Sequence, residues 1–294
     1  MVIRDSGHFG IAHHRALMGG KGQRSTAVGG HFLSCASRKM SAATETSYTF
    51  PKPEAWPYLP LFEKIRYYST ILDAKYAPFV DKLDAKEKVA ALCPEVRTAT
   101  VVKVLEAPSD LVAADLLQSR PCLLKATHGC GWNHILSPTD DLRTLQTMLA
   151  AWQKPYSGDE KQYTYLKPRF FIETIVDDVY TGKSGKARVF MIRCIHGRPV
   201  SVGVRVGNGS NVQNSYNLDF TLVEKARFAM EKPTQWEAML DYATKLSAPF
   251  EFVRIDFYLA TDGNVYFSEF TFTPAGGHQV FSIIRERELG RLWT

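Results

Sequence analysis

Two acidic residues near the C-terminus are placed where they could share a cation. The segments FVRIDFYLA and NVYFSEFTF are rich in aromatic and β-branched residues and meet at Asp262-Gly263, a strong signal for a β-hairpin. If these two residues form the loop, Asp256 stands directly opposite Glu269. Because directly opposed Cβ atoms are roughly 4.5–5.5 Å apart, the two carboxylates must repel each other, raise one pKa or bind a shared cation.

The side chains around this pair favour a hard metal ion. The same register places Arg254 opposite Thr271, on the face of the ribbon that carries both carboxylates. Oxygen ligands without an adjacent His or Cys suit Mg²⁺ or Mn²⁺ better than Zn²⁺, so Asp256, Glu269 and Thr271 are the predicted metal ligands. There are two alternatives. In the first, the sheet faces solvent and Arg254 neutralises the acids. In the second, the loop is one residue longer or shorter, which shifts the register and removes the pairing of the two acids.

A second group of functional side chains lies in the segment LLKATHGCGWNHIL. Lys125 ends an expected strand, and a loop with two glycines follows it. Small residues let backbone N–H groups approach phosphate oxygens, and the lysine adds a positive charge. A plain hairpin turn would give the same pattern. His128, Cys130 and His134 could instead bind a transition metal, although their spacing matches no standard zinc motif.

Two further strands carry charged residues. In KPRFFIETIVDD, Glu173 lies near the end of a strand that runs into Asp177 and Asp178. In ARVFMIRCIHG, Arg188 and Arg193 project from a strand, and paired basic groups suit a polyphosphate. An ordinary strand end and charges on a sheet surface are the alternatives.

The elements around these motifs combine helices with antiparallel strands. Helices are expected over 61–72, 81–92, 109–120, 139–152 and from Thr234 onward, where Thr234 and Glu237 form a capping box. Besides the C-terminal hairpin, strands are expected over 98–105, 122–126, 170–176, 187–195 and 199–206. Helices segregated from antiparallel strands define an α+β fold rather than a doubly wound parallel sheet.

Composition excludes several classes of protein. The chain has 294 residues, 45% of them hydrophobic and 22% charged, which is typical of globular proteins. No apolar run approaches the roughly 20 residues of a membrane helix, so we expect a soluble protein without a membrane span. The net charge is +6, but residues 1–40 hold six basic residues and one acid, leaving 30 basic and 29 acidic groups elsewhere. A nucleic-acid partner is therefore not expected.

The N-terminal segment differs from the rest of the chain. Residues 1–46 show no sustained periodicity and are expected to be a disordered or targeting tail ahead of a folded domain over 47–294. Met40 could open a shorter chain, and an organelle transit peptide is the other possibility. Five cysteines without a CxxC pair fit a reducing compartment. We expect a cytoplasmic protein, with organelle import through the tail as the alternative.

Taken together, the motifs resemble the ATP-grasp superfamily in order and its TupA-like branch in detail. The resemblance covers about residues 58–291. The matching residues are Asp81, Lys82 and Lys86; Lys125, His128, Gly129, Gly131 and Asn133; Glu173, Ile175 and Val176; Val253, Arg254, Asp256, Phe257 and Tyr258; and Glu269, Thr271, Phe272, Thr273 and Pro274.

The resemblance implies an ATP-grasp fold, two lobes whose antiparallel sheets clamp ATP. Its parts would be an N-terminal part (47–120), a central lobe (121–176) and a C-terminal lobe (177–294). The ATP-binding residues it implies are Lys125, His128, Gly129, Gly131, Asn133, Glu173, Ile175 and Val176. Asp256 and Glu269 would hold Mg²⁺, and Arg188 and Arg254 would neutralise the transferring phosphoryl group.

The implied activity is an ATP-grasp carboxylate–amine ligase that forms an acyl phosphate. Its substrates would be small-molecule, peptide or saccharide carboxylates and amines, contacted by residues 207–220 and 276–279. An ATP-dependent phosphotransferase acting on a hydroxyl and a non-catalytic ATP-binding module are the alternatives. The sequence departs from the family pattern at Thr271, where Asn is the usual ligand, and in the phosphate loop at Thr127, Cys130 and Trp132.

Overall fold

The computed structural model describes residues 48–156, 160–181, 187–207 and 212–294. These residues belong to one compact unit, Thr46–Thr294. The tail expected over 1–46 lies outside the described residues, as do positions 208–211 of the expected substrate segment. Within the described part, no helix is long and apolar enough to cross a membrane.

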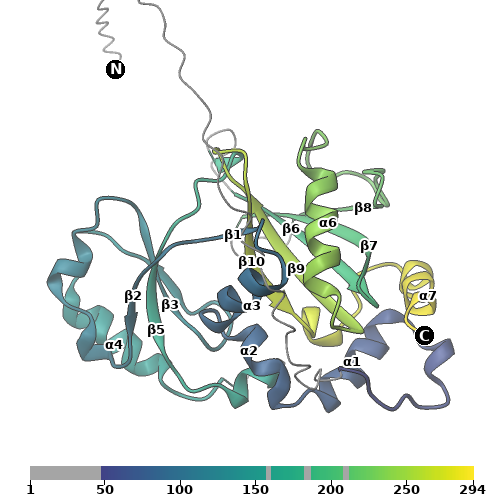
Figure 1. The fold of residues 1–294 in the computed structure, drawn as a ribbon, viewed down its shortest axis with the longest axis horizontal. Coiled ribbons are helices and arrows are strands. Elements are labelled where there is room, and N and C mark those ends of the chain that lie inside the picture. The colour runs from purple at the N-terminus through teal and green to yellow at the C-terminus, as the bar shows by residue number, and fades with distance from the viewer. Residues whose placement is uncertain (1–47, 157–159, 182–186, 208–211) are drawn as a thin grey trace, which may run out of the picture. The chain divides into compact units, whose positions relative to one another are not determined.

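Two sheets make up the framework (Figure 1). The larger has the strand order β1-β10-β9-β6-β7-β8. Its strands are β1 (Arg97–Thr98), β6 (Arg188–Ile195), β7 (Arg198–Val206), β8 (Gln213–Tyr216), β9 (Phe252–Leu259) and β10 (Val265–Thr271). The smaller has the order β2-β5-β3-β4. Its strands are β2 (Val101–Leu105), β3 (Cys122–Ala126), β4 (Asn133–Ile135) and β5 (Phe170–Thr174). Every pairing is antiparallel except that of β1 with β10.

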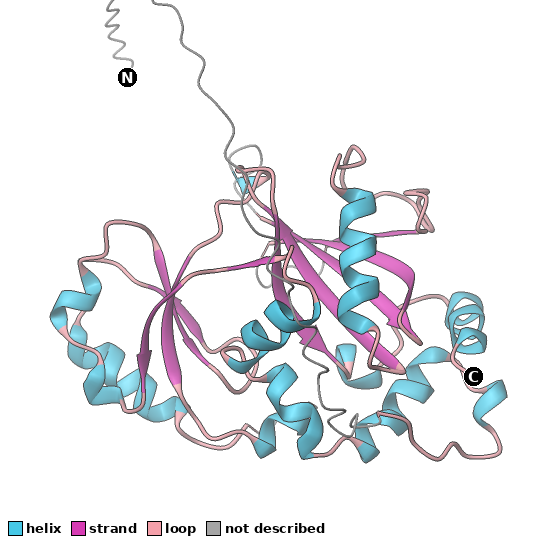
Figure 2. Ribbon diagram, in the orientation of Figure 1, coloured by secondary structure: helices cyan, strands magenta, loops and turns pink. Residues whose placement is uncertain are grey.

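Helices lie against both sheets (Figure 2). The α-helices are α1 (Leu61–Ile71), α2 (Ala77–Val80), α3 (Asp84–Leu92), α4 (Leu142–Trp152), α6 (Trp236–Ser247) and α7 (Ile283–Leu292). Short 3₁₀ helices occur at Trp56–Tyr58, Ala74–Tyr76, Pro108–Asp110, Ala113–Leu116, Lys161–Tyr165 and Pro274–Gly277. Helices combined with antiparallel sheets confirm the predicted α+β class.

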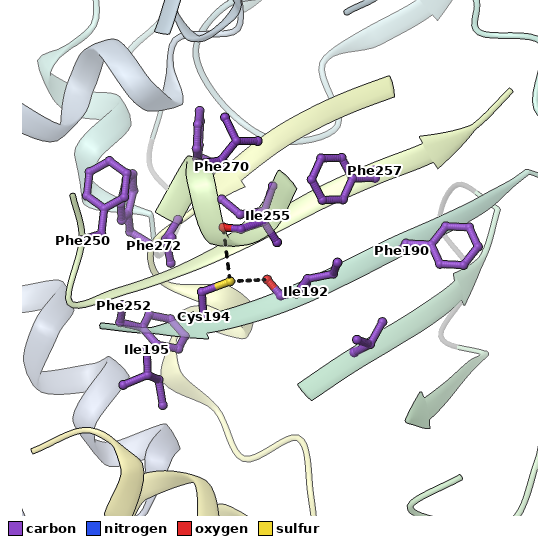
Figure 3. Packing of buried hydrophobic residues seen from close by; sticks show 14 of the residues in the cluster. Phe190, Ile192, Cys194, Ile195, Phe250, Phe252, Ile255, Phe257, Phe270 and Phe272 are labelled. Atoms are coloured by element: carbon purple, nitrogen blue, oxygen red, sulfur yellow. Dashed lines mark hydrogen bonds between the residues drawn. The ribbon is translucent and has the colours of Figure 1, made fainter. Parts of the chain in front are cut away.

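The core of the six-stranded sheet lies under α6. Figure 3 shows Phe190 and Ile192 of β6 beside Ile255 and Phe257 of β9, all fully buried. On the same face, the Cys194 thiol lies 3.8 Å from a backbone carbonyl oxygen of α6. Because successive strand residues point to opposite faces, the residues between these apolar ones point away from α6. Asp256 is one of them, so the side of the sheet opposite the core carries the predicted metal ligands.

The four-stranded sheet has the same two-sided construction. Leu124 and Ile172 pack in a core with Leu145 and Leu149 of α4, which Figure 2 shows on the side of this sheet away from the six-stranded sheet. The alternate residues of β3 and β5 therefore face the other way. Lys125 is among them, so the charged face of the small sheet is free of the helix.

One predicted strand is divided between the two sheets. Residues 98–105 do not form a single strand, because Arg97–Thr98 pairs with β10 whereas Val101–Leu105 pairs with β5. The chain crosses from one sheet to the other between them. Composition alone could not show this, because β-branched residues stand on both sides of the crossing, Thr98 before it and Val101 and Val102 after it.

Two helix predictions are also wrong in detail. Residues 109–120 form two short 3₁₀ turns rather than a helix. In the first, the Asp110 carboxylate accepts hydrogen bonds from the backbone N–H groups of Glu106 and Ala107, and such side-chain bonds compete with helix formation. The expected capping box of α6 is absent, because the Thr234 hydroxyl donates to Gln235 and Glu237 pairs with a lysine instead.

Candidate active site

The β9–β10 hairpin brings the predicted metal ligands together. Asp256 stands opposite Glu269 and Arg254 opposite Thr271, as the sequence predicts. The tip nevertheless has one residue more than expected: the Ala260 N–H donates to the Asn264 carbonyl at 3.0 Å. A β-bulge between Phe267 and Glu269 compensates for the longer loop. The extra tip residue and the bulge cancel, so the acidic pair keeps its register.

Arg254 links the oxygen atoms of this cluster. Its Nε and Nη2 atoms donate to the two carboxylate oxygens of Asp256, each at 2.6 Å. Nη2 also lies 3.0 Å from Glu269 Oε1 and 3.0 Å from Thr271 Oγ1. The bidentate contact with Asp256 is the strongest form of an arginine–carboxylate pair. Arg254 therefore offsets part of the negative charge of the two acids, but on a buried face rather than on the solvent-facing sheet of the alternative.

The two carboxyl groups differ in their acidity. Asp256 is only 1% exposed, and burial raises its pKa to about 6 against the opposing charge of Arg254. Burial also acts to raise the pKa of Glu269, but the charges of Arg254 and Lys82 outweigh it and lower this pKa. Both groups are therefore mainly ionised at neutral pH, with Asp256 the first to take up a proton as the pH falls.

The donor set fits Mg²⁺ or Mn²⁺ that is shared with a phosphate ligand. Among the residues that the structure describes, no group of three or more His, Cys, Asp or Glu side chains could hold a metal ion alone. Mg²⁺ is commonly bound through one or two carboxylates together with substrate phosphates and water. Asp256, Glu269 and the hydroxyl of Thr271 meet that requirement, provided that phosphate oxygens complete the coordination.

A buried charge cluster faces this hairpin from the four-stranded sheet. Glu173 on β5 is 6% exposed. One of its carboxylate oxygens lies 2.8 Å from Lys125 Nζ and the other 2.9 Å from Lys86 Nζ. Burial opposes ionisation of Glu173, but the two lysines lower its pKa overall. The cluster therefore holds one more positive than negative charge.

A cavity joins the two sheets at this cluster. Its empty space is about 910 Å³, a figure that includes volume open to solvent. Its lining includes Lys125, Glu173, Ile175, Val176, Tyr258 and Phe267. Four of the predicted ATP-binding residues thus meet in one cavity. Tyr258 lies two residues from Asp256 on the same face of β9, so the cavity continues toward the acidic pair.

The predicted phosphate loop lies beside this cavity with both glycines in left-handed backbone conformations. Gly129 has a φ of +92° and Gly131 a φ of +75°. A Cβ at Gly129 would lie 2.7 Å from Tyr156, whereas one at Gly131 would meet nothing within 4 Å. Lys82 Nζ donates to the Gly129 carbonyl at 2.6 Å. Asn133 is exposed and stands opposite Lys125 in the sheet.

His128 turns away from the cavity. It is 1% exposed, and its Nε2 lies 2.9 Å from the Trp152 carbonyl oxygen of α4. His134, the other histidine of the possible transition-metal set, contacts Asp140 at 2.9 Å. The two histidines therefore have separate partners, and the position of His128 suits a structural role under the loop.

Arg188 also lies apart from the acidic pair. It shares the face of β6 that carries Phe190, and its guanidinium lies 4.8 Å from the ring centre of Phe228. Arg193, five residues later, lies on the opposite face in register with Arg254. The sequence could show that Arg188 and Arg193 lie on opposite faces, because an odd separation along a strand has that effect. It could not show which of the two faces the acidic pair, because that depends on the register of β6 with β9.

Three further charged residues belong to the site. Lys82 and Lys86 line the cavity, and burial together with the charge of Lys125 lowers the pKa of Lys82 to about 8. Burial and the charge of Glu269 raise the pKa of Glu160 to about 7. Both lysines stand in the sequence motif near Asp81, but Glu160 lies in a segment without any recognisable pattern.

Solved structures similar to this chain include a synthetase and two ligases, all of low sequence identity to it. N5-carboxyaminoimidazole ribonucleotide synthetase (purK) in its ADP complex has 14% identity and a TM-score of 0.43, covering 71% of this chain and 50% of its own. D-alanine–D-alanine ligase from Bacillus anthracis complexed with ATP has 14% identity and a TM-score of 0.40, covering 66% and 54%. L-amino acid ligase from Bacillus licheniformis has 13% identity and a TM-score of 0.42, covering 68% and 41%.

The chain spans about half the length of these solved structures. No curated protein matches it. A family model described as TupA-like ATPgrasp matches residues 63–293, a range that includes both sheets, the acidic pair and the phosphate loop. This chain therefore belongs to the TupA-like ATP-grasp family.

Proposed function

We propose that the protein is an ATP-dependent ligase that joins a carboxylate to an amine through an acyl phosphate, with Mg²⁺ as cofactor. The observation that carries the proposal is the position of Asp256 opposite Glu269, next to a cavity that Lys125 enters from the other sheet. Family membership supports the use of ATP. The arrangement offers ligands for a metal ion and a cation for phosphate at the same site.

ATP would occupy the cavity between the sheets. Ile175 and Val176 line its apolar part and would contact adenine, partly through their backbone. Lys125 and the backbone of the loop containing Gly129 and Gly131 would contact the phosphates, as positive charge and N–H groups do in other anion sites. In this assignment, Glu173 holds Lys125 and Lys86 in place rather than contacting ATP directly.

Mg²⁺ would be held by Asp256, Glu269 and Thr271, where it would neutralise charge on the phosphates. Arg254 already contacts all three side chains, so it lies where it can direct positive charge toward the transferring phosphoryl group. We assign this role to Arg254 alone, because Arg188 lies on the other face of the sheet. A non-catalytic binding module would not need this convergence of charges.

The reaction proceeds in two balanced steps. A carboxylate oxygen of the first substrate attacks the γ-phosphorus of ATP, and ADP leaves as the acyl phosphate forms. The amine of the second substrate then attacks the acyl carbon, phosphate leaves, and the amine loses a proton. No side chain of the protein becomes covalently bound. The contribution of the protein is positioning and charge stabilisation, which dominate phosphoryl transfer.

Trapping the acyl phosphate tests this function. The full chain is incubated with Mg-ATP, hydroxylamine and a panel of amino acids and other carboxylic acids, and both ADP and hydroxamate are measured. We expect Mg-dependent ADP release with a matching amount of hydroxamate for at least one acid. A phosphate ester of a hydroxyl compound would instead establish the phosphotransferase. ATP binding without any turnover across the panel would overturn the ligase assignment.

A further inference from the structure

A second cavity opens on the face of the six-stranded sheet that carries the acidic pair. Its empty space is about 790 Å³, a figure that includes volume open to solvent. Its lining includes Arg205, Gln213, Ser215, Lys225, Arg227 and Phe281. Arg205 is on β7, the next two residues are on β8, and the others come from the loops that follow β8 and precede α7. None of these residues lines the cavity proposed for ATP.

The charge of this second cavity favours an anion. Arg205, Lys225 and Arg227 line it together with a single acid, Glu224. The Nε atom of Arg205 is buried and has no hydrogen-bond partner within the described part of the chain. A buried donor without a partner is costly, and arginine recognises carboxylate and phosphate with particular geometric precision.

The basic loop is held in place by β8. Asn214 is 2% exposed; its side-chain oxygen accepts a hydrogen bond from the Arg227 N–H at 2.8 Å, and its amide donates to the Phe228 carbonyl at 2.9 Å. One residue along β8, the Ser215 carbonyl accepts from the Val223 N–H at 2.9 Å. Lys225 lies between these two anchor points, so the cavity has a fixed wall.

The opposite wall is fixed as well. Glu286 accepts hydrogen bonds from the backbone N–H groups of Val280 and Phe281, each at 3.0 Å. The ring of Phe281 in turn covers the guanidinium of Arg193 at 4.7 Å. Arg193 is 4% exposed, and its Nη1 has no hydrogen-bond partner among the described residues. A second unpaired arginine nitrogen thus lies behind this wall.

Gly203 forms part of the sheet beneath these donors. A Cβ added at Gly203 would lie 3.1 Å from Met191 Cε and 3.8 Å from both Arg193 Nη1 and Gln213 Nε2, so the two nitrogens lie near the same point above the sheet. Gln213 lines the second cavity, whereas Arg193 lines a small neighbouring pocket that shares Val280 and Phe281 with it.

The sheet register connects this cavity to the acidic pair. Ser215, Gly203, Met191 and Asp256 are successive partners on β8, β7, β6 and β9. Neighbouring strands are about 4.8 Å apart, so Ser215 and Asp256 are separated by roughly 14 Å across one face. A ligand in the cavity could therefore extend to the acidic pair.

We propose that the cavity lined by Arg205, Lys225 and Arg227 binds an anionic group, carboxylate or phosphate, of a substrate whose reacting carboxylate lies at Asp256 and Glu269. This inference rests on the proposed ligase function for the position of the reacting end. It assigns the acyl donor to the class of acids that carry a second anionic group, placed at the far end of an extended molecule.

Binding measurements test the inference separately from catalysis. With Mg-ADP present at saturating concentration, the dissociation constants of sebacate, decanoate and inorganic phosphate are measured by titration calorimetry on the full chain. The variant is Lys225→Gln/Arg227→Gln, because both residues are exposed and their replacement leaves the core intact. The matched control is Arg198→Gln, which removes an exposed arginine of β7 outside the cavity.

In the wild-type protein we expect sebacate, whose two carboxylates lie far enough apart to span the site, to bind more tightly than decanoate, which lacks the second carboxylate. The double variant should weaken the binding of sebacate or of phosphate at least tenfold, and Arg198→Gln should change neither. A selective loss of sebacate binding identifies a carboxylate, and a selective loss of phosphate binding identifies a phosphate group. Unchanged affinity for both anions in the double variant, or equal affinity for sebacate and decanoate, would overturn the inference. Anion binding without ADP release would instead overturn only the ligase function.

Discussion

At the scale of single residues, Arg254 determines how the acidic pair behaves. It compensates the charge of Asp256, which is almost completely buried, and reaches Glu269 with the same guanidinium. Removing one partner of a buried pair leaves an uncompensated charge, which costs more than the pair itself contributes. A divalent cation could supply the missing compensation, because the carboxylates would remain opposed across the hairpin.

Arg254→Met tests this reasoning without any assay of activity. In the absence of divalent ions we expect the free energy of unfolding to fall by about 3–5 kcal/mol. Added Mg²⁺ should raise the melting temperature of this variant more than that of the wild type. Arg97→Met is the control, because its pair with Asp262 is exposed and is worth about 1 kcal/mol or less. If Mg²⁺ stabilises Arg254→Met no more than the wild type, the oxygen cluster is not a cation site.

Lys82 gives the site a dependence on pH. Burial and the charge of Lys125 lower its pKa to about 8, so the free protein loses this charge as the pH rises through 8. Bound phosphate would raise the pKa again, so ATP binding at pH 8.5 should take up protons. Calorimetry in two buffers of different ionisation enthalpy measures the uptake, and Lys82→Met should abolish it. Identical binding enthalpies in both buffers for the wild type would contradict the placement of Lys82 at the phosphates.

At the scale of elements, the hairpin shows both the strength and the limit of sequence reasoning. The pairing of Asp256 with Glu269 was predictable from composition and the Asp262-Gly263 signal, and the structure has it. The longer tip and the bulge near Ser268 were not predictable from the sequence. The predicted pairing is nevertheless correct, because their effects on the register cancel at the two acids. The strand period could place Arg188 and Arg193 on opposite faces of their strand. Which of them shares a face with Asp256 depends on the register between strands, and the crossing near residues 99–100 depends on which sheet each half joins.

The phosphate loop makes an element-scale prediction from its two glycines. Both positions have positive φ, which costs other residues roughly 1–2 kcal/mol. Only at Gly129 would a Cβ also meet Tyr156, at 2.7 Å. We therefore expect Gly129→Ala to lower the free energy of unfolding more than Gly131→Ala does, as measured by urea denaturation. Equal effects of the two substitutions would show that the loop tolerates a side chain at Gly129 and that its packing is not fixed.

At the scale of the whole folded unit, the site depends on two sheets at once. Lys125 and Glu173 come from the four-stranded sheet, whereas Asp256 and Glu269 come from the six-stranded one. A cavity lined by residues of both lies where they meet. The sequence could identify each motif and, through the family resemblance, the fold. The expected substrate segment 207–220 includes Gln213 and Ser215 of the second cavity. Its basic residues Arg205, Lys225 and Arg227 were not predictable, because they come from separate segments without a shared pattern.

The affinity of ATP with and without Mg²⁺, in the wild type and in Glu269→Gln, tests the central claim most directly. Titration calorimetry should show that Mg²⁺ strengthens ATP binding at least tenfold in the wild type, or about 1.4 kcal/mol. In Glu269→Gln this gain should disappear. Glu237→Gln, which alters an exposed ion pair on α6, serves as control and should behave as the wild type. A protein that binds no ATP, or a Glu269→Gln variant with the full Mg²⁺ gain, would contradict the account.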